Sequence, residues 1–292
     1  MKEKKELWLN AFRLLRIPFS VFLMPIFWFA LLHTEAELTR AILVFVTLHL
    51  FVYPASNGYN SYFDRDEQSI GGLKTPPKVT RELWYLVVSF DVLALGIGLM
   101  INLLFGVMVF VYLMISKAYS YDKIRLKKYP VIGAITVVLF QGLFTYLAIQ
   151  KGVHHSFSLT ADNLAFGIVS SLFLLGSYPM TQIYQHQEDE QHGDHTLSRM
   201  LGINGTFIFT GIVFFVASAV ICFLFYRNQE IQNIIIYLVA LFPVNIYFLK
   251  WYNDFKKGKP VITFERTMLL NAMSSLLLSA AFITMLLLKE VP

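Results

Sequence analysis

Two acidic segments follow apolar runs and carry the side chains best suited to chemistry in this sequence. The first acidic segment, residues 59–68, reads YNSYFDRDEQ, and the second acidic segment, residues 184–195, reads YQHQEDEQHGDH. If the helix before the first segment continues, Asn60 and Asp64 share one helical face because they are four residues apart. Gln185 and Asp189 have the same spacing. The two segments therefore look like weak copies of each other.

These carboxylates predict a shared cation site. Two acidic clusters that face each other across a cavity repel unless cations lie between them. Mg²⁺ prefers oxygen ligands and commonly combines one or two carboxylates with water and phosphate oxygens. We expect carboxylates from both segments to hold Mg²⁺, which in turn binds a diphosphate. The predicted metal ligands are Asp64, Asp66, Asp189 and Glu188.

A basic stretch lies between the acidic segments, at residues 117–128 (KAYSYDKIRLKK), and predicts direct contacts to phosphate. Arginine offers phosphate a bidentate fork, and basic groups together with metal ions stabilise a leaving diphosphate. We assign catalysis to Lys123 and Arg125 from this stretch and to Asp64 and Asp189 from the acidic segments. The predicted substrate contacts are Asn60, Arg65, Tyr119, Lys127, Lys74 and Gln185.

The elements that position these residues are predicted to be membrane helices. Of the 292 residues, 56% are hydrophobic and 15% are charged, whereas a soluble domain carries about 25% charged residues. Continuous apolar runs of roughly 20 residues favour spanning helices over a barrel. A single cysteine excludes an internal disulfide framework and a thiolate zinc cluster. The nine predicted spans are 17–33, 40–57, 83–101, 103–121, 130–149, 163–184, 203–226, 232–250 and 267–288.

The distribution of Lys and Arg predicts the orientation of these spans. With a cytoplasmic N-terminus, 20 of the 24 basic residues fall on the inner side. Such an excess is the positive-inside pattern, which by itself also explains basic residues in the inner loops. Both acidic segments and the basic stretch then lie at the cytoplasmic face. The four basic residues on the outer side are Arg40, Lys151, Arg227 and Lys289.

Other interpretations of the same residues remain open. An acidic run beyond a span is often only a solvated loop, although two such runs on the side of the basic stretch favour a site. His186, His192 and His195 allow a transition-metal site, but membrane di-iron oxygenases need many histidines on one side and this chain has seven in all. Asp91, inside the third predicted span, is either functional or bonded to a neighbouring helix, and we favour the structural role.

At these motifs the sequence resembles the UbiA-type intramembrane prenyltransferases. NSYFDRD followed by KTPP is similar to the first aspartate-rich motif of that family, often written N-D-x-x-D-x-x-x-D. EDEQHGDHTLSRMLG is similar to the second motif, and YSYDKIRLKKYPVIG is similar to the basic segment between them. The three motifs stand in the order of the family, and the resemblance covers all nine predicted spans.

The resemblance implies transfer of an isoprenoid chain from its diphosphate to an acceptor with Mg²⁺. Carried over by position, Asn60 and Asp64 match the start of the first motif, Asp189 matches the second, and Arg125 and Lys127 match the basic pair. Fewer carboxylates would weaken metal binding, and the chain has lost several. The positions where the family usually has aspartate are occupied here by Ser61, Gln68 and Gln185.

The sequence thus predicts an all-α polytopic membrane protein with about nine transmembrane helices around a central cavity. Residues 1–292 are expected to form a single membrane-embedded domain. The predicted activity is Mg²⁺-dependent transfer of a polyprenyl chain to an aromatic, quinone-precursor or other small acceptor. The expected partners are a polyprenyl diphosphate, that acceptor and membrane lipid, with no nucleic acid. The alternative is a non-catalytic lipid-binding or transport protein on the same fold, which the replaced aspartates favour.

Overall fold

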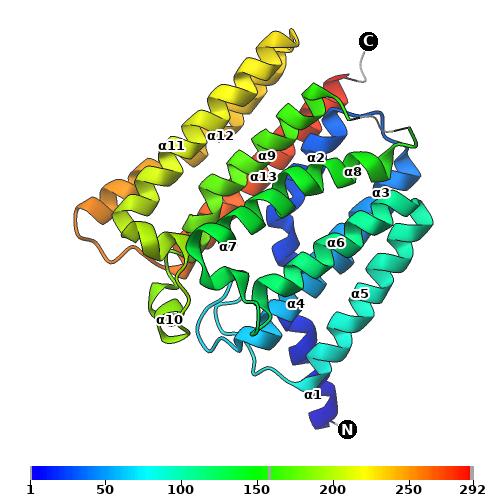
Figure 1. Cartoon of the computed structure of the whole chain (residues 1–292). Helices are drawn as coiled ribbons and strands as arrows, with labels where there is room; N and C mark the ends of the chain where they lie inside the picture. Colours follow the sequence, from blue (N-terminus) through cyan, green and yellow to red (C-terminus); the bar gives the residue numbers. More distant parts are fainter. Residues whose placement is uncertain (1, 157–158, 290–292) are drawn as a thin grey trace.

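The chain folds into long helices that lie against one another, as Figure 1 shows. The computed structural model describes residues 2–156 and 159–289, and their regular structure is helical apart from one isolated bridge between Ile70 and Leu73. The α-helices are α1 Lys2–Leu14, α2 Met24–Leu32, α3 Leu38–Val46, α4 Tyr53–Asp64, α5 Arg81–Ile101, α6 Leu103–Ser120, α7 Pro130–Val137, α8 Thr145–Val153, α9 Ala161–Gln182, α10 His186–Gln191, α11 Leu197–Arg227, α12 Ile231–Lys256 and α13 Phe264–Lys289. The shorter 3₁₀ and π segments are η1 Ile17–Leu23, η2 Thr47–Val52, η3 Leu126–Lys128 and η4 Val138–Phe144.

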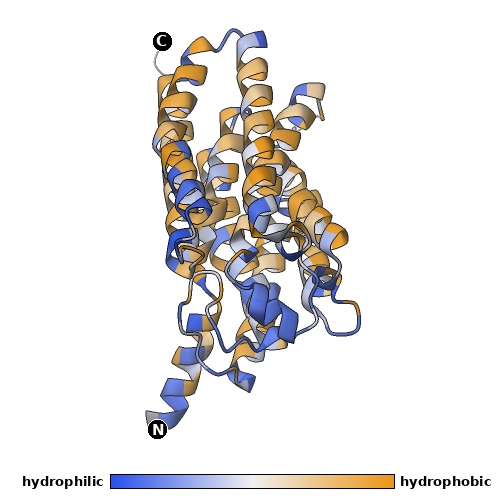
Figure 2. Cartoon of the chain, turned by 90° about the vertical axis from the view of Figure 1, so that its left-hand side faces the viewer, coloured by the Kyte–Doolittle hydropathy of each residue, from blue (hydrophilic) through white to orange (hydrophobic). Residues whose placement is uncertain are grey.

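Within the described residues, nine helical segments are long and apolar enough to cross a membrane. This confirms the predicted all-α architecture with nine spans. Three of the segments combine several elements, namely α1 with η1 and α2, α3 with η2 and α4, and α7 with η4 and α8. The start of α1 and the end of α13 lie at opposite ends of the bundle (Figures 1 and 2), as an odd number of spans requires.

The second span carries the first acidic segment and runs further than predicted. Pro54 has no N–H to donate and would clash with an ordinary helical turn, and the π-helical turn η2 lies directly before it. The helix then continues past the predicted end at residue 57 and stops where Arg65 adopts a left-handed conformation with φ of 53°. Asn60 and Asp64 consequently share one face of α4, and the Asn60 amide donates to the Asp64 carboxylate.

The turn between the third and fourth spans falls at a single residue. Asn102 has extended backbone angles, and its side-chain oxygen accepts from the N–H of Phe105 at 2.8 Å, which caps the start of α6. The Asn102 amide group also donates to the carbonyl of Lys151 at 3.0 Å, which ties this turn to the end of α8. The turn lies inside the MINLLFG stretch and matches the predicted boundary between residues 101 and 103.

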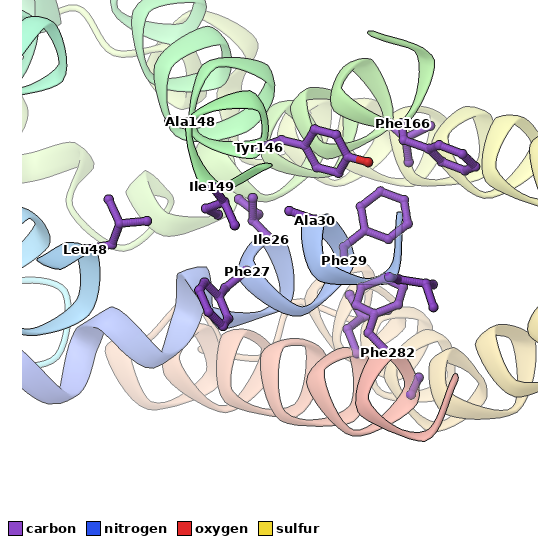
Figure 3. Close-up of a cluster of buried hydrophobic side chains, with 14 of the residues drawn as sticks. Ile26, Phe27, Phe29, Ala30, Leu48, Tyr146, Ala148, Ile149, Phe166 and Phe282 are labelled. Carbon is purple, nitrogen blue, oxygen red and sulfur yellow. The ribbon is translucent and has the colours of Figure 1, made fainter. Parts of the chain in front are cut away.

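The hydropathy of the bundle matches a membrane environment. In Figure 2 hydrophobic residues cover the lengths of the helices, and hydrophilic residues gather towards the ends, most densely at the end with the N-terminus. Large apolar side chains remain exposed on the outer faces, including Met100, Phe215 and Phe242. These faces suit contact with lipid tails, because water would disfavour so large an apolar surface. The bundle interior holds one extended hydrophobic cluster, part of which is drawn in Figure 3.

The intramembrane acid Asp91 is part of an ion pair between neighbouring helices. Its carboxylate lies 2.7 Å from the Lys117 ammonium of α6, and that ammonium lies 5.1 Å from the centre of the Tyr59 ring. Both charged side chains are largely buried. This geometry gives Asp91 a structural role between α5 and α6.

We predict that Asp91→Asn destabilises the protein by about 3 kcal/mol, because removing one member of a buried pair leaves the other charge uncompensated. Replacing both members by leucine should restore most of that loss. Thermal unfolding in detergent micelles measures both effects. Equal stability of Asp91→Asn and the wild type would contradict the structural role.

Candidate functional site

The second acidic segment is presented by a break between α9 and α11. The chain leaves α9 at Gln182, forms the short helix α10 and turns back at Gly193, whose φ of 69° is readily adopted by glycine. This turn brings Asp194 into the interior, where it is almost fully buried. The side chain of Thr196, just before α11, donates to the Asp189 carboxylate at 3.0 Å. Asp189 and Asp194 therefore reach the same region from opposite sides of one turn.

Two cations of the basic stretch join the two acidic segments. Lys127 lies 2.6 Å from Asp64 and 3.3 Å from Asp194, measured between ammonium nitrogen and carboxylate oxygens. Arg125 donates its Nε and one terminal nitrogen to both oxygens of Asp194 at 2.9 and 3.0 Å, and its other terminal nitrogen lies 3.2 Å from Asp64. We call these four residues the ion-pair network. Its two carboxylates are buried, so each charge in the network has partners of opposite sign.

Backbone and side-chain hydrogen bonds hold the acidic segments together as well. Glu188 of α10 accepts from the N–H groups of Glu67 and Gln68, each at 3.1 Å. Gln185 donates to the carbonyl of Ser69 at 3.3 Å. These bonds fix the loop after α4 against α10. The two segments, more than a hundred residues apart in the sequence, form one face.

Asp66 and Asp189 differ from the carboxylates of the ion-pair network in their electrostatics. Burial raises the pKa of Asp189 to about 6, against the hydrogen bond from Thr196. Burial, followed by the nearby charge of Asp64, raises the pKa of Asp66 to about 6. The positive charge of Lys127 acts to lower the pKa of both carboxyls, so its ammonium is close enough to interact with each of them. For both carboxylates, burial outweighs the opposing effect of the positive charges around them.

Asp194 shows the opposite behaviour. Burial acts to raise the pKa of this carboxyl, but the hydrogen bonds from Arg125 and the charge of Lys127 outweigh burial and lower it. The pKa of Lys127 is raised, because the charges of Asp64 and Asp194 outweigh the burial of its ammonium. Asp194 and Lys127 therefore each favour the charged state of the other.

The acidic segments open onto a cavity of about 380 Å³ that extends into the bundle. Its mouth is lined by charged and amide side chains, among them Asn60, Asp64, Lys127 and Gln185. Its deeper wall is mostly apolar and aromatic and comes from η1, α2, α6, α9 and α13. A cavity with this gradient can hold a molecule with an anionic head and a hydrocarbon tail.

Two side chains that sequence reasoning did not assign also line the mouth. Arg16 lies at the break before η1 and donates to the carbonyls of Gly71 and Asn57 and to the Asn60 side chain, at 3.0 to 3.3 Å. Tyr178 of α9 shares a hydrogen bond of 2.8 Å between hydroxyls with Tyr119 of α6, a predicted substrate contact. Tyr119 and Tyr178 place two aromatic rings just inside the charged mouth.

Several predicted site residues lie outside the cavity wall. Lys123 and Arg65 are exposed on their loops. Lys74 forms an exposed ion pair with Glu265 of α13. Glu188 is buried, but it does not line the cavity and one of its oxygens already accepts two backbone hydrogen bonds. Arg125 does not line the cavity either. It contacts Asp64 and Asp194 and can influence the cavity only through them.

The side chains at the cavity mouth decide whether the predicted Mg²⁺ site can form. In the part of the chain that the structure describes, no three His, Cys, Asp or Glu side chains form a group arranged to hold a metal ion. Mg²⁺ that also binds phosphate needs only one or two carboxylates from the protein. Asp66 and Asp189 both line the cavity, and burial raises the pKa of both, so a cation between them would be favoured. These two carboxylates, beside Asp64, fit a Mg²⁺ ion that arrives with a diphosphate.

Comparisons with known proteins agree with the fold and with the sequence motifs. The profile of the UbiA prenyltransferase family matches residues 22–273. No match was found among curated proteins. Among solved structures, a UbiA homologue from Archaeoglobus fulgidus bound to GPP and Mg²⁺ superposes with a TM-score of 0.69 at 19% identity, over 94% of this chain and 99% of that one.

Two further structures give similar results. An apo UbiA homologue from Aeropyrum pernix K1 superposes with a TM-score of 0.67 at 18% identity, over 92% of this chain and 98% of that one. A structure of digeranylgeranylglyceryl phosphate synthase gives a TM-score of 0.61 at 18% identity, over 97% and 99% of the two chains. At these identities the likeness to the solved structures shows a shared fold.

We predict that Asp194→Asn destabilises the protein by about 3–5 kcal/mol, because Arg125 and Lys127 lose a buried counter-charge. Glu190→Gln is the matched control, since Glu190 is exposed and its contact with Arg199 is 3.5 Å long. An exposed pair of this kind contributes about 0–1 kcal/mol. Thermal unfolding of both variants in detergent tests the difference. Similar stability of the two variants would show that the ion-pair network does not hold the site together.

Proposed function

Because the chain belongs to the UbiA prenyltransferase family, we propose that it transfers a prenyl chain from its diphosphate to a small acceptor within the membrane. The acceptor class is an aromatic ring, a quinone precursor or another small nucleophile. One observation carries the proposal, namely a single cavity whose mouth is ionic and whose depth is apolar. The continuous hydrophobic cluster from Ile26 to Met285 supports treating residues 1–292 as one membrane-embedded domain.

In this proposal the charged mouth binds the diphosphate. Lys127 lines the cavity and offers its ammonium to phosphate oxygens, and Asn60 and Gln185 add polar groups. Arg125 keeps Asp64 and Asp194 compensated when Lys127 turns towards the substrate. Arg16 contributes a further buried positive charge at the mouth. These groups together compensate the charge of the head group without bulk water.

The residues that would hold Mg²⁺ are Asp66 and Asp189, with Asp64 beside them. A bound Mg²⁺ would neutralise the diphosphate and make it a better leaving group. The protein contributes the cavity that surrounds the ion and the substrate. Of the three positions where the family usually has aspartate, Ser61 is buried, Gln185 lines the cavity and Gln68 is exposed. Their replacement leaves Asp66 and Asp189 as the proposed metal ligands.

The proposed reaction begins when the bond between the first prenyl carbon and the diphosphate oxygen breaks. The electron pair leaves with the diphosphate, whose growing charge Lys127 stabilises. The allylic cation that remains faces the rings of Tyr119 and Tyr178, and aromatic faces attract cations. The acceptor then forms the new bond to that carbon and releases a proton. The apolar wall excludes water, which would otherwise capture the cation.

A non-catalytic lipid-binding or transport protein is the second candidate function. Its specific support is the ion-pair network, since Asp64 and Asp194 already have cationic partners from the chain itself. Such a protein would bind a prenyl diphosphate without releasing inorganic diphosphate. Measuring diphosphate release with and without Mg²⁺ separates the two candidates.

We predict that the purified protein releases diphosphate from an isoprenoid donor only with Mg²⁺ and an acceptor present. Asp64→Asn and Asp189→Asn should each lower the rate at least 100-fold, since one lost charge-stabilising contact costs about 3 kcal/mol of barrier. Lys74→Ala is the control, because its ion pair with Glu265 lies outside the cavity and its loss should leave the rate unchanged. Full activity of both aspartate variants would refute their proposed roles.

The N-terminus and the cavity mouth are proposed to face the cytoplasm. The support is the excess of Lys and Arg in the segments on that side of the bundle. The natural cysteine Cys222 can be replaced by serine to give a background for labelling.

In that background, Lys74→Cys should resist a membrane-impermeant maleimide in intact cells, whereas Gln229→Cys should react. Lys74 lies in the loop after the first acidic segment, and Gln229 lies in the turn between α11 and α12. Disruption of the membrane should expose Lys74→Cys to the reagent. The reverse labelling pattern in intact cells would overturn the proposed orientation.

A further inference from the structure

A second concave surface lies outside the central cavity, where α7 and α11 begin. Both helices start at the end of the bundle that carries α10 (Figure 1), and the N–H of His195 donates to the carbonyl of Lys128 at 3.2 Å. The pocket between the two helix starts has a volume of about 420 Å³. We call it the α7–α11 pocket, and its lining residues are Lys128, Tyr129, Pro130, His195, Arg199 and Met200. None of these six residues lines the central cavity.

The lining of the α7–α11 pocket carries basic side chains and no carboxylate. Within the part of the chain that the structure describes, the exposed side chains of Lys128 and His195 form no ion pair or hydrogen bond. Arg199 is held in place by donating to the carbonyl of Asp194 at 2.6 Å, and its other terminal nitrogen lies 3.5 Å from the exposed Glu190 carboxylate. An exposed pair of that kind is weak, so the guanidinium remains available. The starts of α7 and α11 add the positive ends of two helix dipoles, which also favour an anion.

Apolar surface begins directly next to these basic groups. Tyr129 and Met200 line the pocket and are more than half exposed, and tyrosine is enriched where membrane meets water. The helices that follow belong to spans of membrane length and are in contact with each other. Their exposed apolar side chains include Val131, Ile132 and Ile135 on α7 and Ile208, Ile212 and Phe215 on α11. A charged pocket at the start of two lipid-facing helices suits a molecule with an anionic head and two hydrocarbon chains better than it suits a free anion.

The concave shape distinguishes this group of basic residues from others at the same end of the bundle. The positive-inside pattern alone places Lys and Arg at the cytoplasmic ends of spans, but it does not require them to converge on one pocket. Lys257, just after α12, is an example of such a residue, because it is exposed and lines neither the α7–α11 pocket nor the central cavity. A comparison of Lys128 with Lys257 therefore separates a built site from a general excess of positive charge.

We propose that the α7–α11 pocket binds the head group of an anionic phospholipid, with Lys128, His195 and Arg199 contacting its phosphate and the acyl chains lying on the exposed faces of α7 and α11. Basic pockets between spanning helices are suited to anionic lipid head groups. A phosphatidylglycerol head carries a net negative charge, whereas the choline of phosphatidylcholine cancels the charge of its phosphate. The inference is independent of prenyl transfer, since it concerns a different surface of the protein.

The test titrates the delipidated full-length protein in a non-ionic detergent with phosphatidylglycerol or with phosphatidylcholine of the same acyl chains, and measures bound lipid by native mass spectrometry. The wild type should bind phosphatidylglycerol at least fivefold more tightly than phosphatidylcholine. Lys128→Met and Arg199→Met should each weaken phosphatidylglycerol binding about fivefold, which corresponds to the roughly 1 kcal/mol that one basic residue contributes next to anionic lipid. Lys257→Met is the matched control and should bind both lipids as the wild type does. Lys128→Met keeps the test valid if Arg199→Met does not fold, because the Lys128 side chain is exposed.

Two further arms exclude other places and other ligands. An anionic lipid that bound at the mouth of the central cavity would be lost in Lys127→Met and kept in Lys128→Met, and that pattern would overturn the assignment to the α7–α11 pocket. Glycerol 3-phosphate carries the same phosphate without acyl chains, and displacement of phosphatidylglycerol by an equal concentration of it would show a site for a soluble anion. Equal binding of the two lipids by the wild type, or equal losses in Lys128→Met and Lys257→Met, would also contradict the proposal.

Discussion

The ion-pair network of Asp64, Asp194, Arg125 and Lys127 is the constraint on which the rest of the site depends. Two buried carboxylates close to Asp66 and Asp189 would repel strongly in a medium of low dielectric constant. The network compensates them with cations from a third segment, so the end of α4, the turn after α10 and the basic stretch must meet at one place. Removing one member of a buried ion pair is energetically costly. The three segments are therefore held in one specific arrangement. The three segments must meet for their charges to be compensated. This requirement determines how the loops on the proposed cytoplasmic side fold.

The spans below the network turn a charged mouth into a long apolar cavity. The extension of α4 beyond its proline aims Asn60 and Asp64 at the mouth, and the break at Arg16 lets η1 and α2 form part of the wall. Where helices deviate from regular geometry, backbone groups lose their usual helical partners. In η4 the Ser171 hydroxyl accepts from the N–H of Leu143 and donates to the carbonyl of Val138. Phe29 and Phe282, whose ring centres lie 4.7 Å apart, line the apolar part of the cavity. Charge therefore determines where a substrate head can lie, and the apolar lining provides the surface that a hydrocarbon tail can contact.

Much of this arrangement could be predicted from residue patterns. Apolar runs of membrane length gave all nine spans, and the spacing of Asn60 and Asp64 predicted their shared helical face. The sequence does not predict which acidic side chain of the second segment points into the protein. That direction depends on the backbone conformation of a single short turn. That turn buries Asp194 at the network and directs Glu188 to the backbone of the opposite loop. Likewise Arg125 and Lys127, but not Lys123, reach the site because Arg125 has a left-handed backbone that redirects the chain. Arg16 had no motif to mark it, since its role follows from the loop carbonyls that surround it.

In the proposed mechanism, Lys127 moves from its carboxylate partners to the substrate head. The most direct test is equilibrium binding of farnesyl thiolodiphosphate, with Mg²⁺, to the wild type, Lys127→Met and Lys128→Met. Lys128 is the adjacent control, because it is exposed and lies outside the cavity lining. We predict a loss of affinity of at least 30-fold for Lys127→Met, equivalent to about 2 kcal/mol, and no change for Lys128→Met. Equal affinity in all three proteins would contradict the account, since the ionic mouth would then not be what binds the diphosphate.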